Sequence, residues 1–135
     1  MKTIHILHIF MSLALLTGCS SPGTKHPSQL SKTALINSTH CYNEKVETVT
    51  NRLNEYFKTC FVASSFSSNS LKIGDIPKGK RISLTTGSSY QYSAELRSGN
   101  NDCKTEAKMY GIDKDWSEVL YQSNLAAYGQ AYKCP

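Results

Sequence analysis

YQYSAELRSGNNDCKTEAKM, residues 90–109, is the stretch that decides the fold. An apolar side chain stands at every second position from Tyr90 to Leu96, which is the period of a strand with one buried face. The segment SGNND at 98–102 has the composition of a turn, and the alternation resumes after it and continues to Met109. The stretch therefore predicts a β-hairpin with one apolar face and one polar face.

A third strand and two helices are predicted around this hairpin. Ile82 and Leu84 alternate with polar neighbours, which extends the hairpin to a three-stranded antiparallel meander. Apolar residues spaced three and four apart predict an amphipathic helix over 42–59 and a second one over 113–128. Residues 61–79 read mainly as loop. Because only the helices can cover the apolar face of the sheet, we expect an α+β, two-layer domain in the order helix, three-stranded antiparallel meander, helix.

The start of the chain predicts export and lipidation. An apolar run from Ile4 to Leu16 is shorter than the about 20 residues that a membrane span needs, so it reads as a signal peptide. The run ends in LTGC, which resembles the lipobox of bacterial lipoproteins. The resemblance implies that the signal peptide is removed and that the thiol of Cys19 is acylated, for example with palmitate. Because Ser20 follows the cysteine, and not aspartate, it also implies an anchor in the outer membrane, on the periplasmic face.

The stretch after the cysteine reads as a tether. Residues 20–40 are rich in serine and threonine and show no apolar period. A flexible segment of this length spans about 25 Å root mean square. We therefore divide the chain into a lipoprotein signal peptide (1–18), the lipidated cysteine with a flexible tether (19–40) and a small disulfide-braced domain (41–135).

Four further cysteines, Cys41, Cys60, Cys103 and Cys134, predict two disulfides, because the periplasm is oxidising. A metal site would need paired cysteines or nearby histidines, and we expect none. A helix over 42–59 is about 26 Å long, whereas the Cα atoms of a disulfide lie within about 7 Å. A continuous helix therefore excludes Cys41–Cys60 and, with it, Cys103–Cys134. The last predicted strand and the second helix are antiparallel, which would bring Cys103 and Cys134 to the same end of the domain. The exclusion of Cys103–Cys134 therefore depends on the first helix being continuous.

Two groups of residues are candidates for an interaction surface. The formal net charge is +5, and its densest cluster can meet an acidic protein or an anionic surface of the envelope. Tyrosines near the second helix can form a patch that is apolar with polar tips. Solvated surface and ordinary packing are the competing interpretations of the two groups. The candidates are Lys72, Lys78, Lys80 and Arg81 in the basic cluster, and Tyr110, Tyr121, Tyr128 and Tyr132 in the aromatic one.

No pattern in the sequence predicts catalysis. GDIPKGKR at 74–81 matches a phosphate-binding loop in part, but Arg81 replaces the serine or threonine that binds magnesium. The acids Asp75, Asp102, Asp113 and Asp115 occupy turn and helix-start positions, where acids ordinarily cap the backbone. We therefore expect a non-enzymatic protein without a cofactor. Nucleic acid is also excluded as a partner by the predicted export.

A second resemblance covers the domain. HCYNEKVETVTNRLNEYFKTCF (40–61), NDCKTEAKMYG (101–111), Trp116 and the final Cys134-Pro135 resemble a family of small, uncharacterised lipoproteins of Gram-negative bacteria. This resemblance implies the architecture and no activity. We expect an outer-membrane lipoprotein that binds another envelope component. The alternative is an inhibitor of, or protective factor against, a wall-degrading enzyme, although such enzymes are usually basic and so is this chain.

Overall fold

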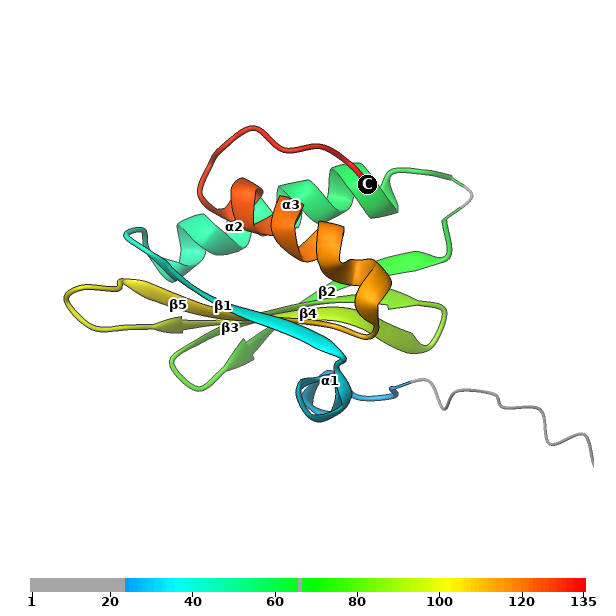
Figure 1. Ribbon diagram of the computed structural model, residues 1–135, viewed down its shortest axis with the longest axis horizontal. Coiled ribbons are helices and arrows are strands. Elements are labelled where there is room, and N and C mark those ends of the chain that lie inside the picture. The colour runs from blue at the N-terminus through cyan, green and yellow to red at the C-terminus, as the bar shows by residue number, and fades with distance from the viewer. Residues whose placement is uncertain (1–23, 66) are drawn as a thin grey trace, which may run out of the picture.

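The protein folds into one antiparallel sheet with two helices on one face and a short helix on the other (Figure 1). The computed structural model describes residues 24–65 and 67–135. In chain order the elements are α1 (Pro27–Thr33), β1 (Ile36–Tyr42), α2 (Val46–Phe57), β2 (Asn69–Ile76), β3 (Gly79–Thr86), β4 (Ser89–Ser98), β5 (Thr105–Gly111) and α3 (Ser117–Ala127). A π-helical turn, Lys58–Val62, continues α2, and a 3₁₀ turn, Lys114–Trp116, precedes α3.

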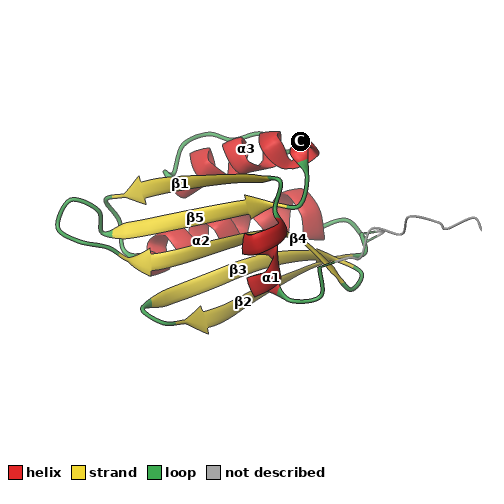
Figure 2. Cartoon of the chain, turned by 60° about the horizontal axis from the view of Figure 1, so that its bottom comes forward, coloured by secondary structure: helices red, strands yellow, loops and turns green. Residues whose placement is uncertain are grey.

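The strand order is β1-β5-β4-β3-β2, so the four strands from β2 to β5 form a meander of consecutive hairpins (Figure 2). The first strand joins beside the last, with Ile36 opposite Gly111 and Tyr42 opposite Thr105. Helix α2 carries the chain from the β1 edge to the β2 edge, across the face that α3 also covers (Figure 1). The sheet therefore has two free edges, β1 and β2.

The core lies between this sheet face and α2 with α3. The alternation in β4 and β5 buries every second residue under the helices, and the apolar stripe of α2 buries the facing side chains. Complete burial of a leucine such as Leu53 means that truncation to alanine removes about 2–5 kcal/mol of stability. The largest buried apolar side chains of this core are Tyr42, Val49, Leu53, Tyr56, Phe57, Ile82, Leu84, Tyr92, Leu96 and Met109.

The α+β class, the two main helices and the two disulfides are as predicted, but the sheet has five strands and not three. Strand β2 falls within 61–79, for which the sequence predicts mainly loop. It is an edge strand whose side chains are mostly exposed, so it needs few apolar residues. Strand β1 begins within the expected tether and ends beyond it, and its residues at alternate positions from Asn37 are exposed.

The predicted boundary between tether and domain is therefore wrong. Helix α1 buries Leu30, and the carbonyl of Thr24 accepts a hydrogen bond of 3.0 Å from the backbone N–H of Tyr90. The folded part thus includes residues 24–40, which were assigned to the tether. The predicted signal peptide and Cys19 lie outside the described residues. Within the ranges 24–65 and 67–135, no helix has the length and apolarity of a membrane span.

The disulfides join Cys41 to Cys103 and Cys60 to Cys134. These pairs confirm the exclusion of Cys41–Cys60: Cys41 lies in β1, and the continuous helix from Val46 to Val62, formed by α2 and its π-helical turn, separates it from Cys60. Cys60 lies in that turn, so the second disulfide fixes the C-terminal segment to the end of α2, while the first fixes the β4–β5 loop to β1.

A lysine-lined pocket as candidate functional site

A cavity of about 580 Å³ opens at the end of the domain where α2 begins and where the β2–β3 and β4–β5 turns come together. We call it the lysine pocket, because four lysines line it. Their side chains are accompanied by a single carboxylate among the lining residues. The lining consists of Lys45, Val46, Glu47, Lys78, Gly79, Lys80, Ser98, Gly99, Asn100, Asn101 and Lys104.

Only one of the four lysines is neutralised. The Nζ atom of Lys80 lies 2.6 Å from Oδ1 of Asp75. This hydrogen bond and the charge of Asp75 raise the pKa of Lys80, and the charge of Glu47 adds to the effect. Lys45, Lys78 and Lys104 have no ion-pair partner in the part of the chain that the structure describes. These three will be called the unpaired lysines, and they leave the pocket with an uncompensated positive charge.

The β2–β3 turn holds one unpaired lysine in a fixed position. Lys78 has φ +61°, a left-handed conformation that costs a non-glycine residue about 1–2 kcal/mol. The turn is attached to the end of β4, because the N–H of Ser98 donates to the Lys78 carbonyl at 2.9 Å and Arg97 donates to the Pro77 carbonyl at 2.8 Å. Gly79 permits this approach, since a Cβ there would overlap the carbonyl oxygen of Leu96.

The β4–β5 loop is equally constrained. The N–H of Gly99 donates to the Lys104 carbonyl, and the N–H of Cys103 donates to the Asn100 carbonyl, both at 3.1 Å. The disulfide to Cys41 attaches the loop to β1. A Cβ on Gly99 would overlap the carbonyl oxygen of Cys103, so the loop needs glycine at this point. These contacts fix the part of the chain that presents Lys104 and the two asparagines to the pocket.

The start of α2 forms the third wall. Lys45 is the N-cap residue, and no side chain of the described residues caps the helix there. The first intrahelical bond is donated by the N–H of Val49 to the Lys45 carbonyl, at 3.2 Å. The N-terminal amides of the first turn therefore lie beside the pocket and add to its positive potential.

The predicted basic cluster is divided between the two faces of the sheet. Lys78 and Lys80 line the lysine pocket, whereas Lys72 and Arg81 lie on the opposite face. Lys72 places its Nζ 5.5 Å from the centre of the Tyr90 ring. The division follows from strand geometry, because successive side chains of β3 point to opposite faces.

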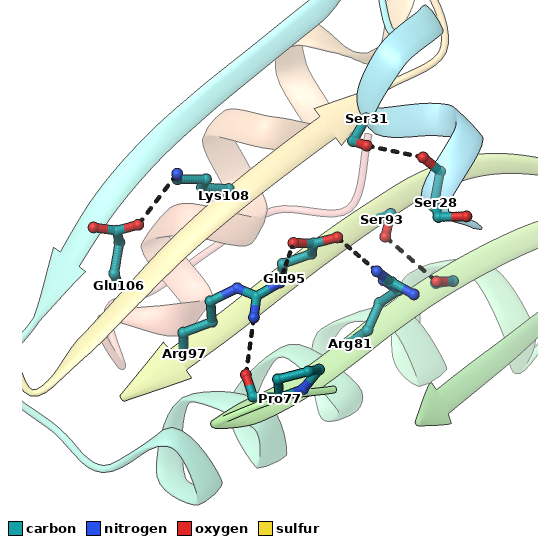
Figure 3. Close-up of polar contacts among 10 residues, drawn as sticks. Ser28, Ser31, Pro77, Arg81, Ser93, Glu95, Arg97, Glu106 and Lys108 are labelled. Carbon is teal, nitrogen blue, oxygen red and sulfur yellow. Dashed lines mark hydrogen bonds and ion pairs between the residues drawn. The ribbon is translucent and has the colours of Figure 1, made fainter. Parts of the chain in front are cut away.

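Arg81 takes part in a charge network on this opposite face (Figure 3). It lies 2.7 Å from one carboxylate oxygen of Glu95, and Arg97 lies 3.0 Å from the other. Burial alone raises the pKa of Glu95, but the hydrogen bonds and charges of the two arginines outweigh it and hold the pKa below its usual value. Arg81 is therefore neutralised within the fold, unlike the unpaired lysines.

The four candidate tyrosines do not form one surface. Tyr128 packs on the ring of Tyr42 and donates to the Cys41 carbonyl at 3.0 Å, and Tyr132 packs edge-on against Tyr56. Tyr121 is exposed on α3. Tyr110 belongs to the face of β5 that alternates with the buried residues, so the sheet separates it from α3.

Two of the four acidic residues named from the sequence have structural partners. Asp75 pairs with Lys80, and Asp113 accepts a hydrogen bond of 3.0 Å from the N–H of Asp115 at the start of the 3₁₀ turn. Across 24–65 and 67–135, no three histidine, cysteine or acidic side chains are grouped as a metal site. Comparisons with protein-family models, curated proteins and solved structures find no match for the chain. Its function is therefore argued from the lysine pocket.

Sequence reasoning identified two of the four pocket lysines and missed Lys45 and Lys104. Each of these stands alone in the sequence, one before a helix and the other after a turn. No local signal marks them. Their proximity follows from the hairpins that bring three chain reversals to the same end of the sheet.

Proposed function

We propose that the protein is a non-enzymatic binding module, anchored through lipidated Cys19 at the periplasmic face of the outer membrane, whose lysine pocket binds an anionic group of another envelope component. One observation carries the proposal: three lysines that have no carboxylate partner among the described residues line a cavity of about 580 Å³. Two disulfides support the expected oxidising compartment. The cationic pocket is a poor match for basic wall-degrading enzymes, so the inhibitor alternative gains no support.

The early start of the folded domain shortens the connection to the anchor. Five residue steps separate Cys19 from Thr24, and they span at most about 18 Å. Thr24 bonds Tyr90 at one end of β4, while Ser98 at its other end lines the pocket. Eight steps of a strand cover about 26 Å. The pocket and the point where the chain joins the domain therefore lie at opposite ends of β4.

Anchoring is tested on the protein expressed in a Gram-negative host. We expect mass spectrometry of the mature N-terminal peptide to find Cys19 acylated, and Cys19→Ala to release the protein from the membrane fraction. An unmodified Cys19 in the wild-type protein would refute the anchor and leave the pocket proposal standing.

Binding is tested by calorimetry at low ionic strength with two dianionic probes, malonate and glucose 6-phosphate. The variant K45Q/K78Q/K104Q removes the charges of the unpaired lysines, and K32Q/K114Q/K133Q is the control because it removes the same charge at exposed positions away from the pocket. We expect at least one probe to bind at least tenfold more weakly to the pocket variant and within twofold of wild type to the control. Equal losses in both variants, or no loss, would refute the proposal.

A further inference from the structure

We infer that the anionic group that the lysine pocket takes is a phosphate monoester or pyrophosphate on a hydrophilic molecule, presented from the side of the domain opposite the lipid anchor. This inference rests on the proposed function. It specifies the chemistry of the ligand and the direction from which it comes, both of which follow from the charges, the lining and the position of the pocket.

The charge of the pocket favours a group with more than one negative charge. The unpaired lysines contribute three positive charges and Glu47 one negative charge, while Lys80 and Asp75 compensate each other, so the excess charge of the pocket is 3 − 1 = +2. A carboxylate carries a single charge, whereas a phosphate monoester carries about −1.5 to −2 near pH 7. One phosphate group therefore compensates most of the excess positive charge of the pocket, whereas one carboxylate compensates a smaller part of it.

The directions of the donors also favour phosphate. The unpaired lysines come from three separate segments: the start of α2, the β2–β3 turn and the approach to β5. Phosphate offers three strong acceptor oxygens that can be approached from several sides. A planar carboxylate is matched best by the fork of an arginine, and the lining residues of the pocket include no arginine.

The rest of the lining indicates a hydrophilic carrier. Ser98, Asn100 and Asn101 supply neutral hydrogen-bonding groups, and Val46 is the one apolar side chain larger than glycine among the lining residues. The lining residues include no aromatic ring, so a nucleobase or a sugar face has no ring to stack on. With a water molecule occupying about 30 Å³, the cavity holds the volume of roughly twenty waters. It therefore has room for a phosphate and for the hydroxylated molecule that carries it.

The position of the pocket indicates the source of the phosphate. Headgroups of the leaflet that holds Cys19 also carry phosphate, but they lie at the Thr24 end of β4, about 26 Å from the pocket by strand rise. The pocket is lined by residues of the β4–β5 loop. Figure 1 shows this loop at the left of the view, away from α1. A phosphorylated molecule that lies beyond the anchoring leaflet can reach the pocket while the domain keeps its orientation. A headgroup of the same leaflet could reach the pocket only if the domain turned over on its short connection.

The test compares glucose 6-phosphate, pyrophosphate, malonate and glucose by calorimetry with the purified lipoprotein in phosphatidylcholine vesicles. Malonate is matched to glucose 6-phosphate in charge, and glucose lacks the charge. We expect the two phosphate compounds to bind at least tenfold more tightly than malonate and glucose. K45Q/K78Q/K104Q should lose at least tenfold in affinity for them, whereas K32Q/K114Q/K133Q should stay within twofold of wild type.

A second arm replaces one fifth of the phosphatidylcholine with phosphatidic acid, whose headgroup is a phosphate monoester. We expect the affinity for glucose 6-phosphate to remain within twofold, because the leaflet headgroups do not reach the pocket. Competition by phosphatidic acid that depends on the unpaired lysines would refute the direction of presentation. Binding of malonate as tight as that of glucose 6-phosphate, with the same lysine dependence, would refute the phosphate class and leave the proposed function intact. No lysine-dependent binding of any probe would refute both.

Discussion

Replacing the Cys41–Cys103 disulfide with serines is expected to weaken both the fold and the lysine pocket, whereas replacing Cys60–Cys134 is expected to weaken the fold alone. Cys103 lies in the loop that presents Lys104 to the pocket, and its disulfide is the covalent link between that loop and β1. Cys60 lies in the π-helical turn that follows α2, so its disulfide acts at the other end of that helix. The two double variants are therefore matched in chemistry and differ in position.

The expected loss of stability follows from the length of chain that each disulfide closes. The linked cysteines are 62 residues apart in one case and 74 in the other. Closing loops of these lengths lowers the entropy of the unfolded chain and stabilises the fold by about 4 kcal/mol each, with a difference of about 0.2 kcal/mol. Because the two loops overlap in sequence, losing one while the other remains costs no more than this.

The assay combines urea unfolding with calorimetric binding of glucose 6-phosphate. We expect both double-serine variants to lose about 4 kcal/mol or less of unfolding free energy, and to agree within about 1 kcal/mol. Only C41S/C103S should bind the probe at least fivefold more weakly, because the loop residues then sample positions outside the pocket. Equal affinities in the two variants would refute the argument that the disulfide positions the loop, and so would a weaker affinity in C60S/C134S.

Three further changes test the packing around this framework. Glu95→Gln should cost about 1–3 kcal/mol at pH 7. Because the pKa of Glu95 is lowered in the fold, its contribution is present above the unfolded value of about 4.3 and is lost as the pH falls through the folded pKa, so the difference in urea unfolding between variant and wild type should shrink as the pH is lowered below about 4. Gly99→Ala should lower the unfolding free energy by more than about 1 kcal/mol, because the new Cβ overlaps a backbone carbonyl. Gly74→Ala serves as the control, because a Cβ there meets no atom within 4 Å, and equal unfolding midpoints of the two variants would contradict the loop geometry. Tyr42→Phe removes the 2.7 Å bond that the hydroxyl donates to Asn124 and should lower the unfolding free energy by about 1 kcal/mol, and an unchanged value would mean that water replaces the bond.

The centre of the fold could be predicted from the sequence, and its edges could not. The strands around 90–109 pack one face against helices and have a neighbour on each side, so their apolar alternation is complete. Among the described residues, β1 and β2 have one neighbouring strand each, so one side of each strand has no partner strand. An edge strand can therefore consist largely of polar residues, and its composition then resembles that of a loop or a tether.

The candidate site was predicted in part for a related reason. The dense basic run at 72–81 suggested one patch, but residues adjacent in a strand point to opposite faces. Lys80 and Arg81 are therefore separated by the sheet, and the period of two already implied this separation. The remaining pocket lysines could not be found from local sequence, because Lys45 and Lys104 meet only after β1, α2 and β5 have packed.

The same correction at the N-terminal edge changes how the proposed function operates. A tether of 21 residues, with a span of about 25 Å, would let the pocket turn toward the membrane or away from it. When the folded chain begins at Thr24, the connection reaches at most about 18 Å, which is less than the roughly 26 Å that β4 places between the attachment end and the pocket. When the domain stands upright on the membrane, the connection between Cys19 and Thr24 is therefore too short to bring the pocket back to the lipid headgroups. Under the proposed function, the length of β4 therefore determines how far from the anchor the pocket would bind its ligand.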